Sequence, residues 1–245
     1  MPRYKLTIEY DGNGLVGWQR QTNGLSVQGA LENALYSFTG QKITIYGAGR
    51  TDAGVHATGQ VCHLDLNDNH TVKVVQNAIN AHLKPNAITV LEVNKVNPRF
   101  NARRDAKSRT YKYRIINRRA PLALEKGRAW WCPIYLDQIK MSKAAEHLVG
   151  KHDFSSFRAS ECQARSPIKT LDKLDIERLG DNIYITAKAR SFLHKQMRAI
   201  VGTLKMVGEG SWTENDVIFA LESKDRQKGG PNAPPDGLYL INVTY

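Results

Sequence analysis

The sequence predicts an α+β fold in two halves, each with helices on one face of a mostly antiparallel sheet. Segments with alternating hydrophobic residues, typical of strands, are interspersed with segments of helical spacing and with turns of hairpin length. The order of these elements is roughly repeated in the second half, without an exact sequence repeat. No Pro- or Ser-rich linker separates the halves, so we expect them to share a sheet or pack tightly. The least apolar connection between the halves lies near residues 98–108. This position predicts one domain over residues 1–104 and another over residues 105–245.

The first half begins with a strand and a capped helix. Tyr4, Leu6, Ile8 and Tyr10 alternate over residues 3–10, and the Gly-rich segment DGNGLVG that follows predicts a turn. Ser26 is suited to cap a helix, whose apolar stripe is Val27, Leu31, Leu35 and Phe38. The remaining expected elements are a strand over 43–46 followed by a Gly-rich loop, a strand over 61–66, a helix over 72–83 and a strand over 87–93.

The second half repeats this alternation. We expect a strand over 109–116, a helix ending in Leu148 and Val149 before Gly150, and strands near 171–176 and 183–187. Thr213 and Asp216 have the spacing of a capping box at the start of a helix. Residues 238–244 predict a final strand. Another helix is expected from Leu193, with one apolar side formed by Met197, Ile200, Val201 and Leu204.

Composition favours a cytoplasmic protein that binds polyanions. The 245 residues carry 35 Lys and Arg against 23 Asp and Glu, a net charge of +12. Such an excess favours nucleic acid as the partner, although charge alone fits a generically basic protein equally well. The three cysteines contain no CxxC pair, which indicates a reducing compartment. The N-terminal residues lack a signal-peptide pattern, and no apolar run has the length of a membrane helix.

The common cofactor and metal motifs are absent. Gly47-Ala-Gly49 begins like a dinucleotide fingerprint, but Asp52 stands where the third glycine would be, and its carboxylate would repel pyrophosphate. The chain has no phosphate-binding GxxxxGK[ST] loop, no HExxH, no deaminase or other zinc spacing, and no GxSxG nucleophile elbow. We therefore expect chemistry that needs neither a metal nor a nucleotide cofactor.

One loop, YGAGRTDAGVHA at residues 46–57, combines small residues with reactive ones. Its glycines and alanines leave room for a substrate to approach the backbone, and Arg50, Thr51, Asp52 and His56 lie among them. A carboxylate beside a cation stays ionised and can act as a nucleophile or base without a metal. The alternative interpretation is an ordinary Gly-rich turn in which Asp52 is a local cap.

This loop, followed by GQV, resembles the signature of the TruA family of tRNA pseudouridine synthases. Further blocks match in order: YKLTIEYDGN, FNARRDAKSRTYKYRI, GKHDFSSF, FLHKQMRAIVGTL and NAPPDGLYLINVTY. The resemblance implies the pseudouridine synthase fold, two ferredoxin-like domains sharing a central sheet. It also implies Asp52 as the catalytic carboxylate, a homodimer that holds tRNA across both subunits, and modification of uridines 38, 39 and 40 in the anticodon arm.

The resemblance also assigns partners to Asp52. Tyr111 matches the active-site tyrosine that stacks on the target base, while Tyr113 on the same strand face is expected in the core. Arg198 matches an arginine that pairs with the catalytic carboxylate; from its position alone it could equally be a surface arginine beside the core. Arg50 and Thr51 are the remaining candidates for substrate binding. His56 is expected to form hydrogen bonds within the loop rather than to shuttle protons.

A basic segment is the candidate tRNA interface. Between residues 99 and 119 a single acid, Asp105, stands among nine Lys and Arg, with aromatic residues interleaved. On a strand about half of such charges point away from any one surface. The candidates for tRNA contact are Arg103, Arg104, Lys107 and Arg109, and Arg20 and Lys195 are possible additional phosphate contacts. The nine basic residues are at positions 99, 103, 104, 107, 109, 112, 114, 118 and 119.

Two hypotheses follow. The first is an isomerase that converts uridine in tRNA to pseudouridine without a cofactor. The second is a non-catalytic RNA-binding or RNA-chaperone module, which explains the charge and the aromatics but gives no reason for an intact Arg50-Thr51-Asp52. The sequence leaves open whether Asp52 attacks C1′ of the ribose, adds to C6 of uracil or removes the C2′ proton.

Overall fold

A computed structural model describes all 245 residues, which form two compact units. Unit 1 comprises Met1–Lys107 together with Tyr239–Tyr245, and unit 2 comprises Ser108–Leu238. The sequence predicts a division at 104/105 and assigns everything after it to one domain. The units differ from this because the last strand pairs with a strand of the first half, a contact that no local pattern predicts.

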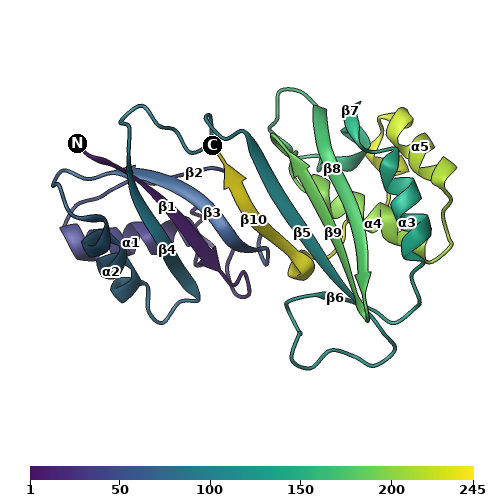
Figure 1. The fold of residues 1–245 in the computed structure, drawn as a ribbon, viewed down its shortest axis with the longest axis horizontal. Helices are drawn as coiled ribbons and strands as arrows, with labels where there is room; N and C mark the ends of the chain where they lie inside the picture. The colour runs from purple at the N-terminus through teal and green to yellow at the C-terminus, as the bar shows by residue number, and fades with distance from the viewer. The chain divides into compact units, whose positions relative to one another are not determined.

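Unit 1 is an α+β unit with two helices on one face of its sheet (Figure 1). The strand order is β4-β1-β3-β10, with the short β2 paired to β3. β1 is antiparallel to both β3 and β4, whereas β10 is parallel to β3. Its elements are β1 (Arg3–Tyr10), α1 (Val27–Thr39), β2 (Tyr46–Gly47), β3 (His56–Asp65), α2 (Val72–Leu83), β4 (Ile88–Val96) and β10 (Leu238–Thr244).

The alternating pattern of β1 and the helix cap of α1 have the roles that the sequence predicts. Tyr4, Leu6, Ile8 and Tyr10 of β1 are all buried, because alternate side chains of a strand face the helices. Ser26 caps α1 by accepting a hydrogen bond from the backbone N–H of Gly29. The face of the sheet that carries α1 and α2 therefore holds the core of the unit.

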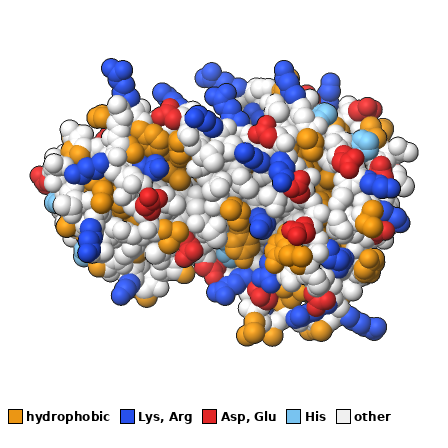
Figure 2. Space-filling model, in the orientation of Figure 1, with side chains coloured by type: hydrophobic (Ala, Val, Ile, Leu, Met, Phe, Trp, Pro, Cys, Tyr) orange, Lys and Arg blue, Asp and Glu red, His pale blue; other side chains and the backbone are white.

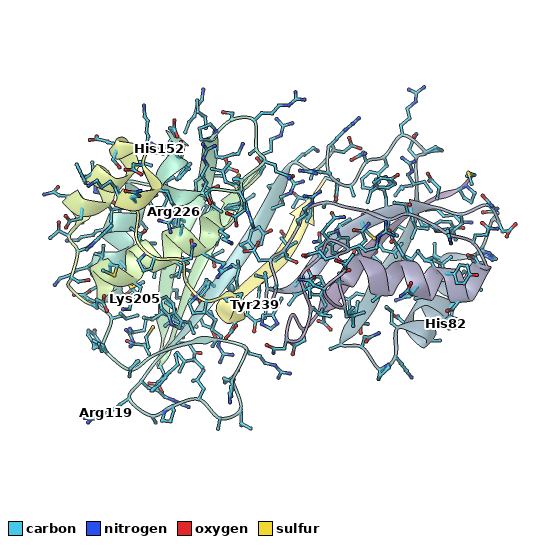
Figure 3. The ribbon with its side chains drawn as sticks, turned by 180° about the vertical axis from the view of Figure 1, so that it is seen from behind. His82, Arg119, His152, Lys205, Arg226 and Tyr239 are labelled. Carbon is cyan, nitrogen blue, oxygen red and sulfur yellow. The ribbon has the colours of Figure 1, made fainter.

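Unit 2 is a second α+β unit, and its helices also cover one face of its sheet, which is turned toward the viewer in Figure 3. Its strand order is β5-β9-β8-β7, all antiparallel, and β6 adds to β5 in parallel. Its strands are β5 (Ser108–Asn117), β6 (Trp130–Cys132), β7 (Gly150–Asp153), β8 (Ile168–Leu179) and β9 (Asn182–Ala189). Its helices are α3 (Gln138–Glu146), α4 (Gln196–Gly208), α5 (Glu214–Ser223) and the short 3-10 turns Ser155–Phe157, Arg226–Lys228 and Pro235–Gly237.

The predicted α+β class with mostly antiparallel pairing is confirmed, with corrections to single elements. The strand expected over 43–46 is reduced to Tyr46–Gly47, because the N–H of Ile45 donates to the Glu32 carboxylate at 3.2 Å instead of to a neighbouring strand. The helix expected to end at Val149 ends at Glu146, and the one expected from Leu193 begins at Gln196. β6 and β7 are too short to show an alternating pattern. No helix is long and apolar enough to cross a lipid bilayer.

Candidate active site

The loop that carries Asp52 connects β2 to β3 within unit 1. Arg50 is exposed, Thr51 is buried and Asp52 is half-buried. The N–H of Val55 donates to the carbonyl oxygen of Asp52 at 3.2 Å, and Gly54 adopts a positive φ of 77°. This turn fixes the backbone on the C-terminal side of Asp52 and leaves its side chain accessible.

The segment that follows β1 holds the loop from the other side. The N–H of Trp18 donates to the carbonyl oxygen of Thr51 at 3.0 Å, and the N–H of Gly54 donates to Leu15 at 3.4 Å. The hydroxyls of Tyr10 and Thr51 are hydrogen-bonded at 2.8 Å in a buried position. The Thr51 side chain is thus turned toward β1, so it fixes the loop. The sequence predicts this segment only as a turn and misses its contact with the loop that carries Asp52.

Two glycines allow these backbones to approach each other. A Cβ placed on Gly17 would lie 2.6 Å from the carbonyl oxygen of Thr51, and Gly17 also has a φ of 101°. A Cβ on Gly12 would lie 2.4 Å from the carbonyl oxygen of Val55. Real Cβ atoms do not approach backbone so closely, so both positions require glycine. Gly12 and Gly17 of DGNGLVG therefore allow the close packing of the loop that carries Asp52.

His56 closes the loop at the start of β3. Its Nδ1 accepts a hydrogen bond from the N–H of Gly12 at 2.9 Å, and its ring stacks on Tyr239 with centroids 4.6 Å apart. Tyr239 is labelled at the start of β10 in Figure 3. The Asp11 carboxylate lies 3.2 Å from the same nitrogen. The predicted hydrogen-bonding role of His56 is confirmed.

Tyr111 and Arg198 belong to unit 2. Tyr111 is 9% exposed on β5 and contacts the Phe192 ring edge-on, with centroids 5.0 Å apart. Tyr113 is fully buried, as expected for a core residue. Arg198 lies half-buried on α4, and its Nε donates to the carbonyl oxygen of Ala233 at 2.7 Å. Pairing of Arg198 with Asp52, and stacking of Tyr111 on the target base, stay predictions.

Most of the exposed cations among residues 99–119 belong to unit 1. Four of them lie after β4, in the connection that ends unit 1's first part at residue 107: Arg99, Arg103, Arg104 and Lys107. Lys and Arg side chains line the edge of the molecule where this connection runs (Figure 2). We name residues 99–107 the basic segment. Arg109 is only 8% exposed, and its guanidinium donates to the carbonyl oxygen of Arg190; its contact with tRNA stays a prediction.

The other basic candidates are engaged by acids. Arg20 donates to Glu32 at 2.8 Å, and Lys195 donates to Glu161 at 2.7 Å. Arg119 is exposed on the long connection between β5 and β6, where Figure 3 labels it. Each paired cation would have to exchange its carboxylate for a phosphate. Among the predicted tRNA contacts, the basic segment therefore holds the largest group of exposed cations.

The basic segment is fixed to the face of the sheet opposite α1 and α2. The Tyr245 hydroxyl donates to the carbonyl oxygen of Ala102 at 2.8 Å, and the N–H of Ala102 donates to Nδ1 of His63 at 3.2 Å. Arg3 donates to the carbonyl oxygen of Phe100 at 2.7 Å. A small hydrophobic cluster packs behind these bonds, and it includes Ala48 of the loop that carries Asp52. Its members are Ala48, Val61, Ala102, Phe100, Val243 and Tyr245.

The acceptor role of His63 predicts a pH effect on stability. Burial lowers the pKa of His63, and the Arg3 guanidinium lowers it further. An unfolded chain binds a proton at this residue below about pH 6.5, whereas the folded chain does not until a lower pH. The free energy of unfolding should therefore decrease as pH falls from 7 toward 5.

Chemical denaturation at these two pH values tests this. The decrease in the free energy of unfolding between pH 7 and 5 should be smaller in His63→Gln, because Gln can accept the Ala102 N–H without titrating. His82 on α2 is exposed, and His82→Gln is the matched control that should keep the wild-type loss. Equal decreases in the free energy of unfolding in wild type and His63→Gln would contradict the assignment of this pH effect to His63.

The thiols and acids form no alternative site. All three cysteines are free, and burial raises the pKa of Cys132 to about 12, which makes this thiol a poor nucleophile. No group of three or more His, Cys, Asp or Glu side chains is arranged to hold a metal ion.

Comparison with known proteins places this loop in a family. The profile of the family described as tRNA pseudouridine synthase matches residues 6–103 and 144–245, which include the whole loop around Asp52, its supporting segment and Arg198. The chain belongs to the tRNA pseudouridine synthase family. The match omits residues 104–143, the part that holds Tyr111 and the long connection from β5 to β6.

Individual relatives extend the similarity over the full length. The tRNA pseudouridine synthase A of Paramagnetospirillum magneticum is 56% identical over 245 residues, covering 100% of this chain and 96% of the relative. The protein of the same name from Sinorhizobium fredii is 56% identical, with 100% of both chains covered. That from Rhodospirillum rubrum is 52% identical and covers 100% of this chain and 88% of its own length. Residues 104–143 are therefore part of the shared chain as well.

Proposed function

We propose that this protein is a tRNA pseudouridine synthase that isomerises uridine at positions 38, 39 and 40 of the anticodon arm. The observation that carries the proposal is the fixed loop around Asp52. A half-buried carboxylate is presented from a backbone held by Trp18, Tyr10 and two glycine contacts. Family membership and relatives named tRNA pseudouridine synthase A support the reaction.

The reaction needs one ionised carboxylate beside the target sugar. The N1–C1′ bond of uridine breaks, the uracil turns, and a C5–C1′ bond forms. C5 then loses a proton and N1 gains one, so the product is an isomer and the atoms balance without an oxidant or an energy source. Asp52 can attack C1′, add to C6 or remove the C2′ proton, and each path requires its charged form.

The other predicted residues support this carboxylate. The target base must leave its stack to reach Asp52, and we propose that Tyr111 stacks on the extruded base and that Arg198 pairs with the carboxylate. Arg50, exposed two residues before Asp52, would contact a neighbouring phosphate. Thr51 keeps the loop in register through its bond to Tyr10.

The tRNA backbone would lie on Arg103, Arg104 and Lys107, whose exposed charges suit phosphates. We propose a homodimer, as the family resemblance implies, and sedimentation of the purified protein tests it. Three free cysteines and a tRNA substrate support action in the cytoplasm.

The direct test is incubation of purified protein with unmodified tRNA transcript, without added metal or nucleotide. Carbodiimide mapping should detect pseudouridine at positions 38–40, and a transcript with cytidine at these positions should stay unmodified. Tight tRNA binding without any product would contradict the enzyme and favour the non-catalytic RNA-binding module.

A further inference from the structure

Tyr46 is an exposed aromatic residue at the entrance to the catalytic loop. It lies on β2, directly before Gly47, and 57% of its surface is exposed. One face of its ring stacks on His63, with centroids 5.2 Å apart and planes inclined by 21°. The opposite face of the ring is therefore accessible from solvent.

The support behind Tyr46 is rigid. His63 is 3% exposed and accepts the N–H of Ala102 at 3.2 Å. Its ring also meets Phe100 edge-on, with centroids 6.1 Å apart, and Phe100 packs against Tyr245 at 4.9 Å. Four rings thus form a fixed array, and only the outermost, Tyr46, presents a large exposed surface. Core packing accounts for the inner three rings but leaves the exposure of Tyr46 unexplained.

Exposed cations lie on the segment that holds this array in place. The N–H that fixes His63 belongs to Ala102, so the exposed Arg103 and Arg104 follow directly from the support of the ring. The one acid of the segment, Asp105, accepts the backbone N–H of Asn101 at 2.7 Å. An open aromatic face beside several cations suits a ligand with both flat rings and phosphates. Single-stranded nucleic acid has both, since its unpaired bases stack on aromatic side chains while its backbone binds Lys and Arg.

We propose that Tyr46 is a stacking platform for an unpaired base of the tRNA substrate, and that the basic segment binds the phosphates next to that base. The proposal rests on the proposed function, because it assumes that RNA is the ligand. It adds a contact distinct from the extruded target base, which is assigned to Tyr111. Tyr46 thereby contributes to substrate binding and takes no part in the chemical step.

Binding measurements on two variants test the stacking. Tyr46→Ala should weaken the affinity for unmodified tRNA about 5- to 100-fold, the range typical of one base–aromatic stack, and should raise KM more than it lowers kcat. Tyr46→Phe keeps the ring and should bind like wild type. A fully paired RNA duplex has no unpaired base, so its affinity should be the same for Tyr46→Ala and wild type.

Salt dependence separates stacking from charge. The slope of log Kd against log salt should be unchanged in Tyr46→Ala, whereas Arg103→Gln should reduce it by about one phosphate contact. Thermal unfolding of each variant monitors the fold, and Tyr46→Leu, which keeps an apolar contact with His63, replaces Tyr46→Ala if the latter is unstable. Wild-type tRNA affinity in both Tyr46→Ala and Tyr46→Leu, or an equal loss for duplex RNA, would overturn the platform. Failure of the proposed function would instead show as wild-type protein that binds tRNA without forming product.

Discussion

Asp52→Asn should abolish pseudouridine formation, lowering turnover by about 10³-fold or more, while tRNA affinity stays within about twofold of wild type. The amide has the shape of the carboxylate but neither its charge nor its nucleophilicity. The hydrogen bond that the Val55 N–H donates goes to the backbone carbonyl of this residue, which the substitution leaves unchanged. Tritium release from C5-labelled uridine in tRNA measures turnover, and filter binding measures affinity.

The matched control is Asp68→Asn, which removes a charge from an exposed aspartate of the same unit. It should retain wild-type turnover, because Asp68 lies outside the catalytic loop. Substantial turnover in Asp52→Asn would remove this carboxylate from the chemistry. Loss of tRNA binding in the same variant would give it a binding role instead.

Gly17→Ala should damage both stability and activity. The new Cβ would lie 2.6 Å from the carbonyl oxygen of Thr51, next to Asp52, and the backbone φ of 101° disfavours any side chain. We expect a loss of about 3 kcal/mol or more in the free energy of unfolding. Relief of the clash moves the catalytic loop, and a displacement of about 1 Å commonly costs about 100-fold in rate.

Gly14→Ala isolates the contact from the backbone strain. Gly14 has a similar positive φ of 75°, but a Cβ there meets nothing within 4 Å. The free energy of unfolding of this variant should fall by only about 1–2 kcal/mol, and its turnover should stay at the wild-type value. Urea denaturation and tritium release on both variants make the comparison. Similar behaviour of the two variants would show that strain, and not the loop contact, dominates.

Local patterns predict those elements that depend on neighbours in sequence. The alternation in β1, the stripe in α2 and the final strand agree with the structure in both bounds, because each pattern spans several residues that face one core. The capping box at Thr213 is likewise present, with its N–H donating to Asp216 at 2.7 Å. These features are encoded within about ten residues of chain.

Contacts between distant segments are what the sequence patterns miss. Charge makes Arg109 a candidate for the RNA surface, but its burial involves Arg190, which directly follows the neighbouring strand β9. The sequence marks Asp52 through its unusual setting, yet the support given by Gly17 and Tyr10 depends on how two loops pack. Neither charge nor periodicity reports such packing. The Gly-rich composition of DGNGLVG was the one available signal, and it predicts only a turn.

The parallel pairing of β10 with β3 has a consequence for biosynthesis. Tyr239 and Tyr245 follow the whole of unit 2 in the chain, yet they stack on His56 and hold Ala102 in unit 1. The bond between Tyr245 and Ala102 spans 143 positions. Domains usually fold as units while the ribosome extends the chain from its N-terminus. Here the first unit is completed only by the last strand, so a nascent chain carries Asp52 long before it contains Tyr239, which stacks on His56, and Tyr245, which bonds to Ala102.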